Sequence, residues 1–452
     1  MSFASLGYLV FLPLVTVLYW RCPGRYRLLL LLAASYGFYM GWSIPFALLL
    51  LGETALCYVA CRILAKHKSK GLFAGLLCLV FMPLLLFKYS GFLAGSLFPD
   101  ASGLFRELVL PVGISFYTFQ AAAFVIDVYR GEQEPEKNFL LFALFVSFFP
   151  QLVAGPIERA EDLLPQLKEE KRFRTEDLDA GIRLLLCGFF RKICVADFLA
   201  PFADRIFSLQ NPQGPTVLLG AVLFGLQIYN DFAGYSEIAM GSARLLGIRL
   251  TRNFRSPYLA RSLRDFWRRW HITLNRWFRA YVYLPLGGKN RRLIAAGAVF
   301  LLSGLWHGAD WTFLCWGAVH GLLYGIESLA LRAGKRKLPP FAAVPLTFFA
   351  VTLAWILFRA ADLGTALQMY RAILTPWHLT AALQEAGATV QAAVYLPAVL
   401  AVSALAGRKA FTEKRFSDRE TAVAVLLALM IGLCWLNNLH SGAANAFIYF
   451  QF

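Results

Sequence analysis

The sequence predicts an all-α polytopic membrane protein with about 11 transmembrane helices, joined by re-entrant and interfacial helices. Three observations lead to this fold class: 58% of the 452 residues are hydrophobic, only 16% are charged, and long runs without charge recur along the chain. Soluble domains carry roughly 25% charged residues, and a membrane-spanning helix needs about 17–25 apolar residues. A single run of this kind would fit a signal peptide, but many runs along the whole length do not.

Basic residues gather in short loops between the apolar runs. This is the pattern of loops that are held at the cytoplasmic face of a membrane. The formal net charge of +17 is therefore explained without a nucleic-acid partner, and we expect none. Anionic lipid headgroups are a second natural partner for such loops. The basic loops are residues 66–70, 289–292, 332–337 and 408–419.

The first third of the chain alternates regularly between apolar runs and basic loops. If the first run enters from outside, the second and third form a hairpin that returns to the cytoplasm, and the fourth and fifth form another. We expect these passes at residues 3–20, 28–42, 45–64, 71–90 and 105–128.

The middle third does not divide into simple passes. The apolar run 184–207 is interrupted by Arg191, Lys192, Asp197 and Asp204, and the run 216–246 by Asn230, Asp231 and Glu237. Charges at membrane depth are costly, so they should face a protein interior or a water-filled cavity. Broken or re-entrant helices are tolerated only in such places. We therefore expect a cavity in this part of the chain.

Residues 252–288 interleave arginines with aromatic side chains. Ser256 and Pro257 are a plausible N-cap and first helical residue, and Pro285 would end the element. So many charges argue against a spanning helix. The mixture of Arg and Trp favours an interfacial amphipathic helix along the cytoplasmic headgroups.

The last third returns to the alternating pattern. The run that starts at Leu293 leaves the cytoplasm and the run after Trp311 returns. Further passes are expected at 341–358, 390–405 and 421–436, which places the tail 441–452 outside the cytoplasm. Because no internal repeat or linker is evident, we expect a single domain over residues 1–452.

The cysteines give no sign of a metal site. The sequence has eight, most of them inside apolar runs, where they are typical of small buried hydrophobic residues. No CxxC or CxxH pair is present, so we expect no bound metal and no permanently bound cofactor.

Three of the six histidines are candidates for chemistry: His271, His307 and His320. In a soluble protein a lone buried histidine is more often a hydrogen-bonded core residue than a catalyst. Inside a membrane a functional role is more common, and a histidine with a near-neutral pKa is a natural general base. His307 is the leading candidate, because Gly304 and Gly308 would let a substrate approach it closely.

The chain resembles the membrane-bound O-acyltransferase family, and within it the membrane subunits that O-acetylate alginate or peptidoglycan. The resemblance is carried by five motifs that together are very specific. They are PVGISFYTFQ at residues 111–120, FFPQLVAGPIER at 148–159, QIYNDFAGYSEIAMG at 227–241, DFWRRWHITLNRWFRAYVYLPLGG at 265–288 and GLWHGADWTFLCWGAVHG at 304–321.

The resemblance implies a role for individual residues and a fold in which an outer funnel meets an inner tunnel at a thin centre. The family's catalytic histidine falls on His307 in the WHG motif, and a second histidine, on the tunnel floor, falls on His271. The family's Asn-Asp pair falls on Asn230 and Asp231. The substrate-binding set that we expect is Asn230, Asp231, Arg268, Arg269, Arg276, Trp306 and His320.

The implied reaction begins with an acyl thioester donor, with acetyl-CoA as the default, arriving from the cytoplasm. Arg268, Arg269 and Arg276 could receive its phosphates, although lipid headgroups would suit them equally. His307 would remove the proton from an acceptor hydroxyl that attacks the thioester. Tyr449 is expected as a transient acyl carrier in the catalytic set with His307 and His271; alternatively, the aromatic tail only packs against the membrane surface.

The acyl group would then pass to an extracytoplasmic acyltransferase partner that modifies a polysaccharide such as alginate or peptidoglycan, with the chain in a bacterial inner membrane. Two alternatives stay open. Asn230, Asp231 and Glu237 also fit a transporter or flippase of a small anionic or lipid-linked substrate, although transporters often show duplicated halves. A scaffold with an inactive site is the other alternative. The acceptor polymer, the acyl chain and the oligomeric state are not fixed by the sequence.

Overall fold

The computed structural model describes residues 1–97, 108–333, 338–387, 397, 417–440 and 447. These residues form helices and irregular segments with no strand among them, which confirms the predicted all-α class. The chain divides into two compact units. The first comprises residues 1–188, 235–252 and 410–424, and the second comprises 189–234, 253–409 and 425–452. The single domain over 1–452 stays a prediction.

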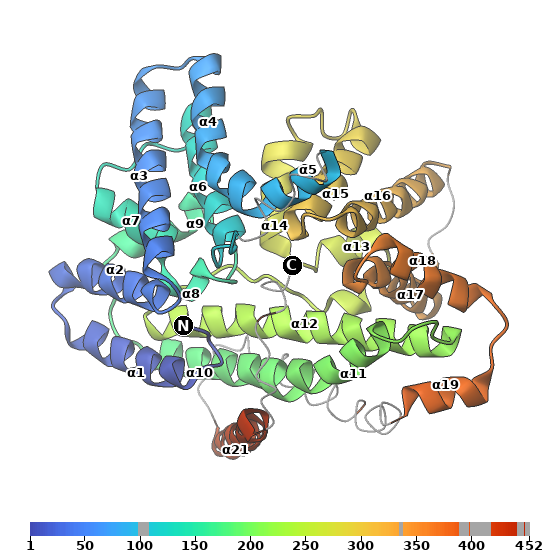
Figure 1. The fold of residues 1–452 in the computed structure, drawn as a ribbon. Helices are drawn as coiled ribbons and strands as arrows, with labels where there is room; N and C mark the ends of the chain where they lie inside the picture. Colours follow the sequence, from blue (N-terminus) through green and yellow to red (C-terminus); the bar gives the residue numbers. More distant parts are fainter. Residues whose placement is uncertain (98–107, 334–337, 388–396, 398–416, 441–446, 448–452) are drawn as a thin grey trace. The chain divides into compact units, whose positions relative to one another are not determined.

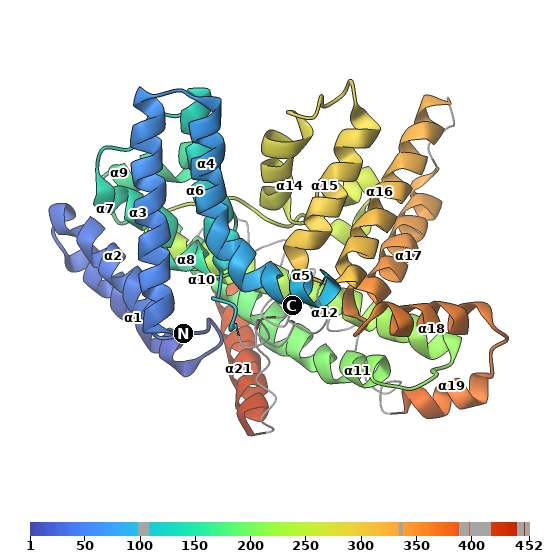
Figure 2. The same cartoon turned by 45° about the horizontal axis from the view of Figure 1, so that its top comes forward.

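The first unit is built mainly from the N-terminal helices. In Figures 1 and 2, α3, α4 and α6 lie side by side, and α7 packs against both α2 and α3. The elements are α1 (Leu6–Arg21), α2 (Gly24–Met40), α3 (Ile44–Lys66), α4 (Lys70–Leu84), the π-helical η1 (Leu85–Tyr89), α5 (Ser90–Leu97), α6 (Ile114–Arg130), α7 (Phe139–Ser147), α8 (Phe149–Leu152), α9 (Ala160–Lys168) and α10 (Thr175–Phe189).

Local chemistry explains where these helices begin. Ser5 and Ser43 accept hydrogen bonds from the first turns of α1 and α3, so each fills an N-cap position. The helix predicted over 105–128 begins later than expected, at Ile114, because Gly113 before it takes a left-handed conformation with φ +77°. Residues 98–107 lie outside the described part of the chain.

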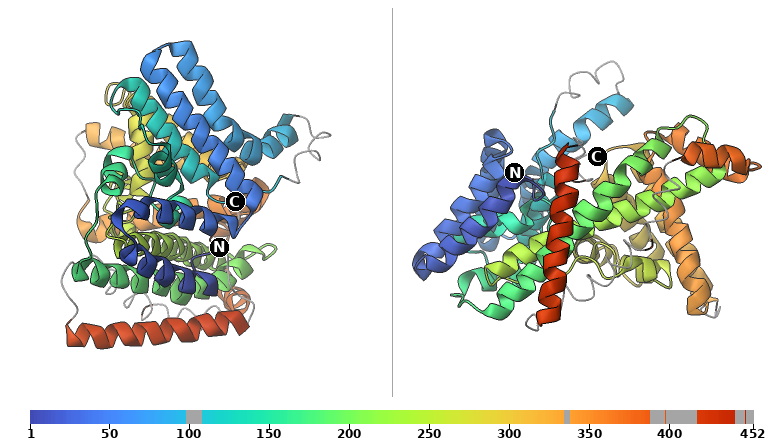
Figure 3. Two further views of the ribbon diagram at one scale, coloured as in Figure 1. Left: turned by 90° about the vertical axis from the view of Figure 1, so that its left-hand side faces the viewer. Right: turned by 90° about the horizontal axis from the view of Figure 1, so that it is seen from below.

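The second unit contains the histidines of interest. Figure 2 shows α15 and α16 as a hairpin with α17 beside α16. Helix α11 runs along α12 in Figures 1 and 3, and the ring centroids of Phe207 and Phe224 from these two helices are 5.9 Å apart. The elements are the π-helical η3 (Phe190–Ala196), α11 (Asp197–Phe207), α12 (Gly214–Leu245, whose last turns belong to the first unit), the 3₁₀ turn η4 (Pro257–Leu259), α13 (Leu263–Trp267), α14 (Ile272–Phe278), the π-helical η5 (Arg279–Tyr283), α15 (Arg292–His307), α16 (Trp311–Arg332), α17 (Pro340–Arg359), α18 (Leu363–Leu374), α19 (Leu379–Ala386) and α21 (Asp418–His440, which the two units share).

The two charged apolar runs of the middle third are each helical without a break, which differs from the broken helices that we expected. Helix α12 runs unbroken for 32 residues, and α10 continues through η3 into α11. The polar groups are accommodated by pairing instead. Lys192 bonds both Asp231 and Asp197, and Arg191 donates to Asn230, so the buried charges are matched inside the protein.

The predicted interfacial helix over 252–288 is not one helix but several short helical pieces. Its main break is at His271, which has φ +46° and separates α13 from α14. Pro257 does begin a helical turn, but Ser256 has φ +46° and its side chain makes no capping hydrogen bond. A residue with positive φ lies in the left-handed region of φ/ψ space and cannot continue a right-handed helix.

Five described helical stretches are long and apolar enough to cross a membrane. They are Ile44–Lys66, Lys70–Leu97, Gly214–Leu245, Trp311–Leu331 and Pro340–Arg359. Shorter apolar helices at Leu6–Arg21, Arg292–His307 and Glu420–Leu436 match other predicted passes. The total of about 11 passes stays a prediction, and the pass expected at 390–405 lies almost entirely outside the described residues. The funnel and tunnel stay predictions as well.

Candidate active site

Glycines bring α15 and α16 into close contact around His307. A Cβ atom on Gly304 would collide with the carbonyl oxygen of Phe313, and one on Gly317 would collide with the carbonyl oxygen of Phe300. Gly308 ends α15 in an extended conformation, and Asp310 then caps α16 by accepting from the backbone N–H of Thr312 at 2.8 Å. His307 is thus the last residue of a helix whose direction is fixed by backbone contact.

His307 is 2% exposed and lies among aromatic rings. Its ring centroid is 5.0 Å from that of Trp306, 5.2 Å from that of Trp316 and 5.3 Å from that of Phe358 on α17. The aromatic surroundings exclude bulk water, and electrostatic and hydrogen-bonding interactions are stronger in such a medium. The position suits a base that must act on a weakly acidic hydroxyl.

The structure brings His271 close to His307. The two ring centroids are 6.5 Å apart, and the His271 ring also contacts Trp306 at 5.5 Å and Phe232 of α12 at 4.7 Å. A non-glycine residue with positive φ is uncommon, and such residues cluster at functional sites. The prediction that these two histidines belong to one site is supported by this geometry, while their roles stay predictions.

The turn at His271 is held by Asn253, a residue that the sequence reasoning missed. The backbone N–H of Ile272 donates to the Asn253 carbonyl at 2.9 Å, and Asn253 Oδ1 accepts from the backbone N–H and the hydroxyl of Thr273. The same oxygen lies 3.2 Å from His271 Nδ1. Asn253 falls outside the motifs that carry the resemblance, so the sequence offered no signal for it.

His271 is neutral near pH 7. Burial lowers the pKa of its imidazole to about 3, because a charged ring would lose its hydration. A neutral imidazole has one nitrogen that carries a hydrogen and donates, and one that carries a lone pair and accepts. The contact with Asn253 involves Nδ1, so it affects which of the two nitrogens carries the hydrogen.

His320 lies in the same aromatic cluster, one turn of α16 after Trp316. Its ring centroid is 4.8 Å from Trp316 and 5.0 Å from Trp267, and it stacks on Phe300 at 6.2 Å. Trp316 therefore has His307 and His320 as neighbours. The three histidines singled out in the sequence meet in one cluster; a substrate-binding role for His320 and Trp306 stays a prediction.

Asn230 and Asp231 make their polar contacts with η3. Asp231 bonds Lys192 at 2.5 Å, and Asn230 Oδ1 accepts from Arg191 at 3.2 Å. These contacts give the pair a clear structural role in joining α12 to η3. The neighbouring Phe232 on α12 contacts the His271 ring, with the two ring centroids 4.7 Å apart.

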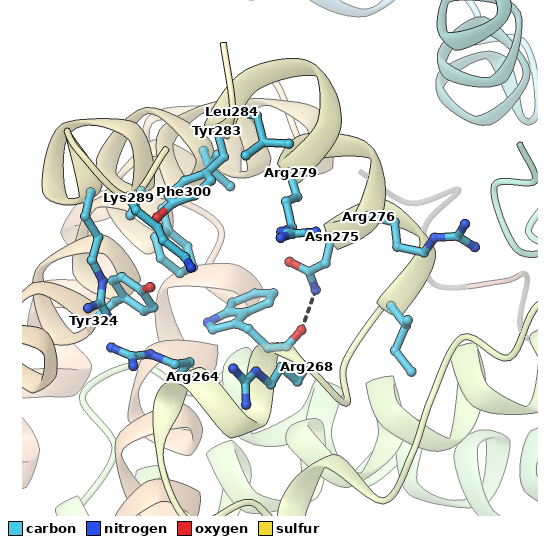
Figure 4. Close-up of a pocket in the computed structure, with 15 residues that line it drawn as sticks. Arg264, Arg268, Asn275, Arg276, Arg279, Tyr283, Leu284, Lys289, Phe300 and Tyr324 are labelled. Carbon is cyan, nitrogen blue, oxygen red and sulfur yellow. Dashed lines mark hydrogen bonds between the residues drawn. The ribbon is translucent and has the colours of Figure 1, made fainter. Parts of the chain in front are cut away.

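A cationic pocket of about 710 Å³ lies at the start of α15. Figure 4 shows its labelled residues, with the Arg279 head near Asn275 and the Arg276 head directed away from the other cations. The walls are aromatic and aliphatic, which suits an anionic ligand with an apolar part. The cations that line it are Arg264, Arg268, Arg276, Arg279, Lys289 and Arg292.

Two of the three arginines predicted to receive phosphates, Arg268 and Arg276, line this pocket. The third, Arg269, does not; its Nε donates to Asp265 at 2.9 Å. Lys289 and Arg292 also line the pocket. From the sequence, the basic loop that contains them predicted only which side of the membrane it lies on. Their spacing in sequence could not show that they face α13 and α14.

The C-terminal tail reaches the site through Phe447. This side chain is fully buried, and its ring centroid is 5.5 Å from that of Phe232, the residue that also contacts His271. Tyr449, the predicted acyl carrier, lies outside the described residues.

Among the residues that the structure describes, no group of three or more His, Cys, Asp or Glu side chains is arranged to hold a metal ion.

Comparison with known proteins identifies the family. The family model for the membrane-bound O-acyltransferase family matches residues 135–336, which include His271, His307 and His320. The probable alginate O-acetylase AlgI of Pseudomonas putida is 36% identical over the full length of both chains. This chain belongs to the membrane-bound O-acyltransferase family.

Other members of the family are also similar to this chain. The probable alginate O-acetylase AlgI of Pseudomonas aeruginosa is 40% identical over 84% of this chain and 76% of that protein. The peptidoglycan O-acetyltransferase of Helicobacter pylori is 34% identical over 76% of this chain and 73% of that protein. Family membership together with several apolar helices identifies a multi-pass membrane protein.

Proposed function

We propose that the protein is an O-acetyltransferase of a bacterial inner membrane that takes an acetyl group from a cytoplasmic thioester and passes it outward for polysaccharide O-acetylation. The observation that carries the proposal is the buried pair of His307 and His271, 6.5 Å apart, in the unit that also holds the cationic pocket. The names of the relatives support acetyl as the acyl group and alginate or peptidoglycan as the kind of acceptor.

Helix α15 indicates how long the donor must be to reach from the cationic pocket to His307. Arg292 and Phe300 both line the pocket and are eight residues apart on this helix, which is about 12 Å at 1.5 Å per residue. From Phe300 to His307 is seven more, or roughly 10 Å. A donor whose phosphates bind the cations therefore needs a long, narrow arm to carry its thioester to His307, and acetyl-CoA has this shape.

The reaction follows from the chemistry of an imidazole base. His307 takes the proton of an acceptor hydroxyl as the hydroxyl oxygen attacks the thioester carbonyl. The new C–O bond forms, the C–S bond breaks, and the thiolate takes the proton back from the imidazolium. No proton is gained or lost overall, and the products are an ester and a free thiol.

Tyr449 is the proposed first acceptor. It follows Phe447 by two positions in the sequence, and two residues of extended chain span at most about 7 Å. Because the Phe447 ring packs on Phe232 beside His271, the tail has the reach to present a hydroxyl to the histidines. A partner protein outside the cytoplasm would then take the acetyl group from the tail to the polysaccharide.

The test is intact-protein mass spectrometry of purified protein incubated with acetyl-CoA, comparing the parent with His307→Gln and Tyr449→Phe. We expect one acetyl group on the parent, localised to Tyr449, and none on either variant. His378→Ala is the matched control, because His378 is exposed at the start of α19 and outside the site.

Retained acetylation in His307→Gln would refute the general-base assignment. If Tyr449→Phe still gains the acetyl group, the tail is not the carrier and direct transfer to a partner is the better model. If the parent consumes no thioester at all, the transporter alternative gains support.

A further inference from the structure

The hydrogen bonds of Asn253 fix the identity of its amide atoms. The backbone N–H of Thr273 can only donate, and it lies 3.3 Å from the atom assigned as Asn253 Oδ1. The Thr273 hydroxyl donates to the same atom at 3.0 Å. That atom must therefore be the oxygen, because an amide NH₂ group cannot accept a hydrogen bond.

This assignment determines the tautomer of His271. Because Asn253 Oδ1 accepts, His271 Nδ1 at 3.2 Å must carry the hydrogen. In a neutral ring the other nitrogen, Nε2, then carries the lone pair and acts as the acceptor.

We propose that Asn253 is a positioning residue that fixes His271 in the Nδ1–H tautomer and so makes Nε2 a hydrogen-bond acceptor toward a hydroxyl, thiol or amide N–H in the active site. For its part in catalysis, the inference rests on the proposed acyl transfer. In the same way, the base of many active sites is oriented by a neighbouring side chain that hydrogen-bonds its second nitrogen. Asn253 itself is buried, and its proposed part in the reaction is through His271.

The surroundings of His271 make it sensitive to a charge at position 253. Its described neighbours on α12, on α15 and in the loop before η4 include Phe232, Trp306 and Phe254, which carry no charge, and the titratable His307. Burial holds its pKa near 3. A carboxylate at hydrogen-bond distance favours the imidazolium and raises a histidine pKa by about 1–3 units.

Asn253→Asp is the informative variant, because aspartate can accept all three hydrogen bonds that Oδ1 accepts while adding one negative charge. Asn211→Asp is the matched control, since Asn211 is exposed in the loop before α12 and also has positive φ, which aspartate tolerates. The first measurement is the rate of thiol release from acetyl-CoA between pH 5 and pH 9.

We expect Asn253→Asp to lose rate relative to the parent as the pH falls from 7 to 5, because a His271 pKa raised from about 3 to about 4–6 brings its acid limb toward this range, while the parent's limb lies below it. At pH 8.5 the rate should stay within about threefold of the parent. Protonated His271 would no longer offer Nε2 as an acceptor, which explains the loss at low pH. Asn211→Asp should follow the parent at every pH. A purely structural role for Asn253 would scale the rate without moving the limb, so superimposable limbs would overturn the inference.

A second measurement does not depend on acyl transfer. In the parent, the folded pKa of His271 lies far below the unfolded value of about 6.5, so the unfolded chain binds the extra proton and the thermal stability falls as the pH drops below about 6.5. In Asn253→Asp the raised folded pKa reduces this effect, so the melting temperature should fall less between pH 8 and pH 5.5 than in the parent.

The two measurements separate the two failures. If the parent releases no thiol, the proposed function fails, but the melting temperatures still test the contact between Asn253 and His271. An equal fall in melting temperature for parent and variant would refute that contact. If the parent is active and only the pH profile is unchanged, His271 does not act as an acceptor in the reaction.

Discussion

Arg279 of the cationic pocket leads to a prediction about binding of the acetyl-CoA donor. Arg279 lines the pocket, and in Figure 4 its head lies near Asn275, whose amide donates to the carbonyls of Trp267 and Trp270 at 2.7 Å. We expect Arg279→Gln to raise the KM for acetyl-CoA about tenfold and to leave kcat nearly unchanged. A tenfold change corresponds to about 1.4 kcal/mol, which is typical of one charge-assisted hydrogen bond.

The control for this variant is Arg371→Gln, because Arg371 is exposed on α18 and lines no part of the pocket. Steady-state rates at several ionic strengths would make the comparison, since phosphate binding by arginine weakens as salt is added. An unchanged KM in Arg279→Gln, or an equal change in the control, would mean that the donor phosphates bind elsewhere.

Among single residues, the sequence predicted the histidines of the site but not Asn253, the residue that hydrogen-bonds one of them. His307 and His271 were predicted from the sequence, and the structure places them 6.5 Å apart. Asn253 was not predicted, because its contact with His271 depends on a left-handed turn 18 residues along the chain. Propensity alone gives no reason to expect positive φ at a histidine that precedes an isoleucine.

The hairpin of α15 and α16 depends on contact between backbones, which leads to a prediction at the scale of elements. A methyl group on Gly304 would meet the Phe313 carbonyl, whereas one on Gly297 of the same helix would meet nothing within 4 Å. We therefore expect Gly304→Ala to destabilise the protein by about 1–3 kcal/mol, as overpacking does, and to lower acyl transfer through a displaced His307.

Gly297→Ala should be neutral or slightly stabilising, because alanine has the better helix propensity. Thermal unfolding in detergent and the rate of acetyl transfer would be measured on both variants. Equal behaviour of the two would show that helix contact at Gly304 does not set the position of His307.

The elements themselves were predicted unevenly. Four of the five helix starts predicted in the first third lie within a few residues of those in the structure, because apolar runs and basic loops alternate there, whereas the helix predicted from 105 begins at Ile114. The continuous α12 was not predicted, since the partners of Asn230 and Asp231 lie 39 residues earlier in η3 and local sequence cannot show such pairing. The segment 252–288 looked like one amphipathic helix because its composition is uniform, while its break at His271 is held by hydrogen bonds to Asn253.

For the whole molecule, the charge pattern of the loops predicts on which side of the membrane each loop lies. Lys68 follows α3, Lys289 lines the cationic pocket, and Gln384 lies on α19 after the outward pass of α17; all three are exposed. Positive loops stay in the cytoplasm, so Lys68 and Lys289 should face the cytoplasm and Gln384 should face outside. This orientation also decides where a cytoplasmic thioester can enter.

Single cysteines at these positions test the orientation with a maleimide that does not cross membranes. In intact cells we expect Gln384→Cys to be labelled, and Lys68→Cys and Lys289→Cys to be labelled only after the cells are opened. The parent is the control for its own eight cysteines. Labelling of Lys289→Cys from outside would place the cationic pocket on the wrong side for a cytoplasmic donor. In that case the arginines would have to serve another anion, and outward transfer by His307 would be refuted even if the protein proved to be an acyltransferase.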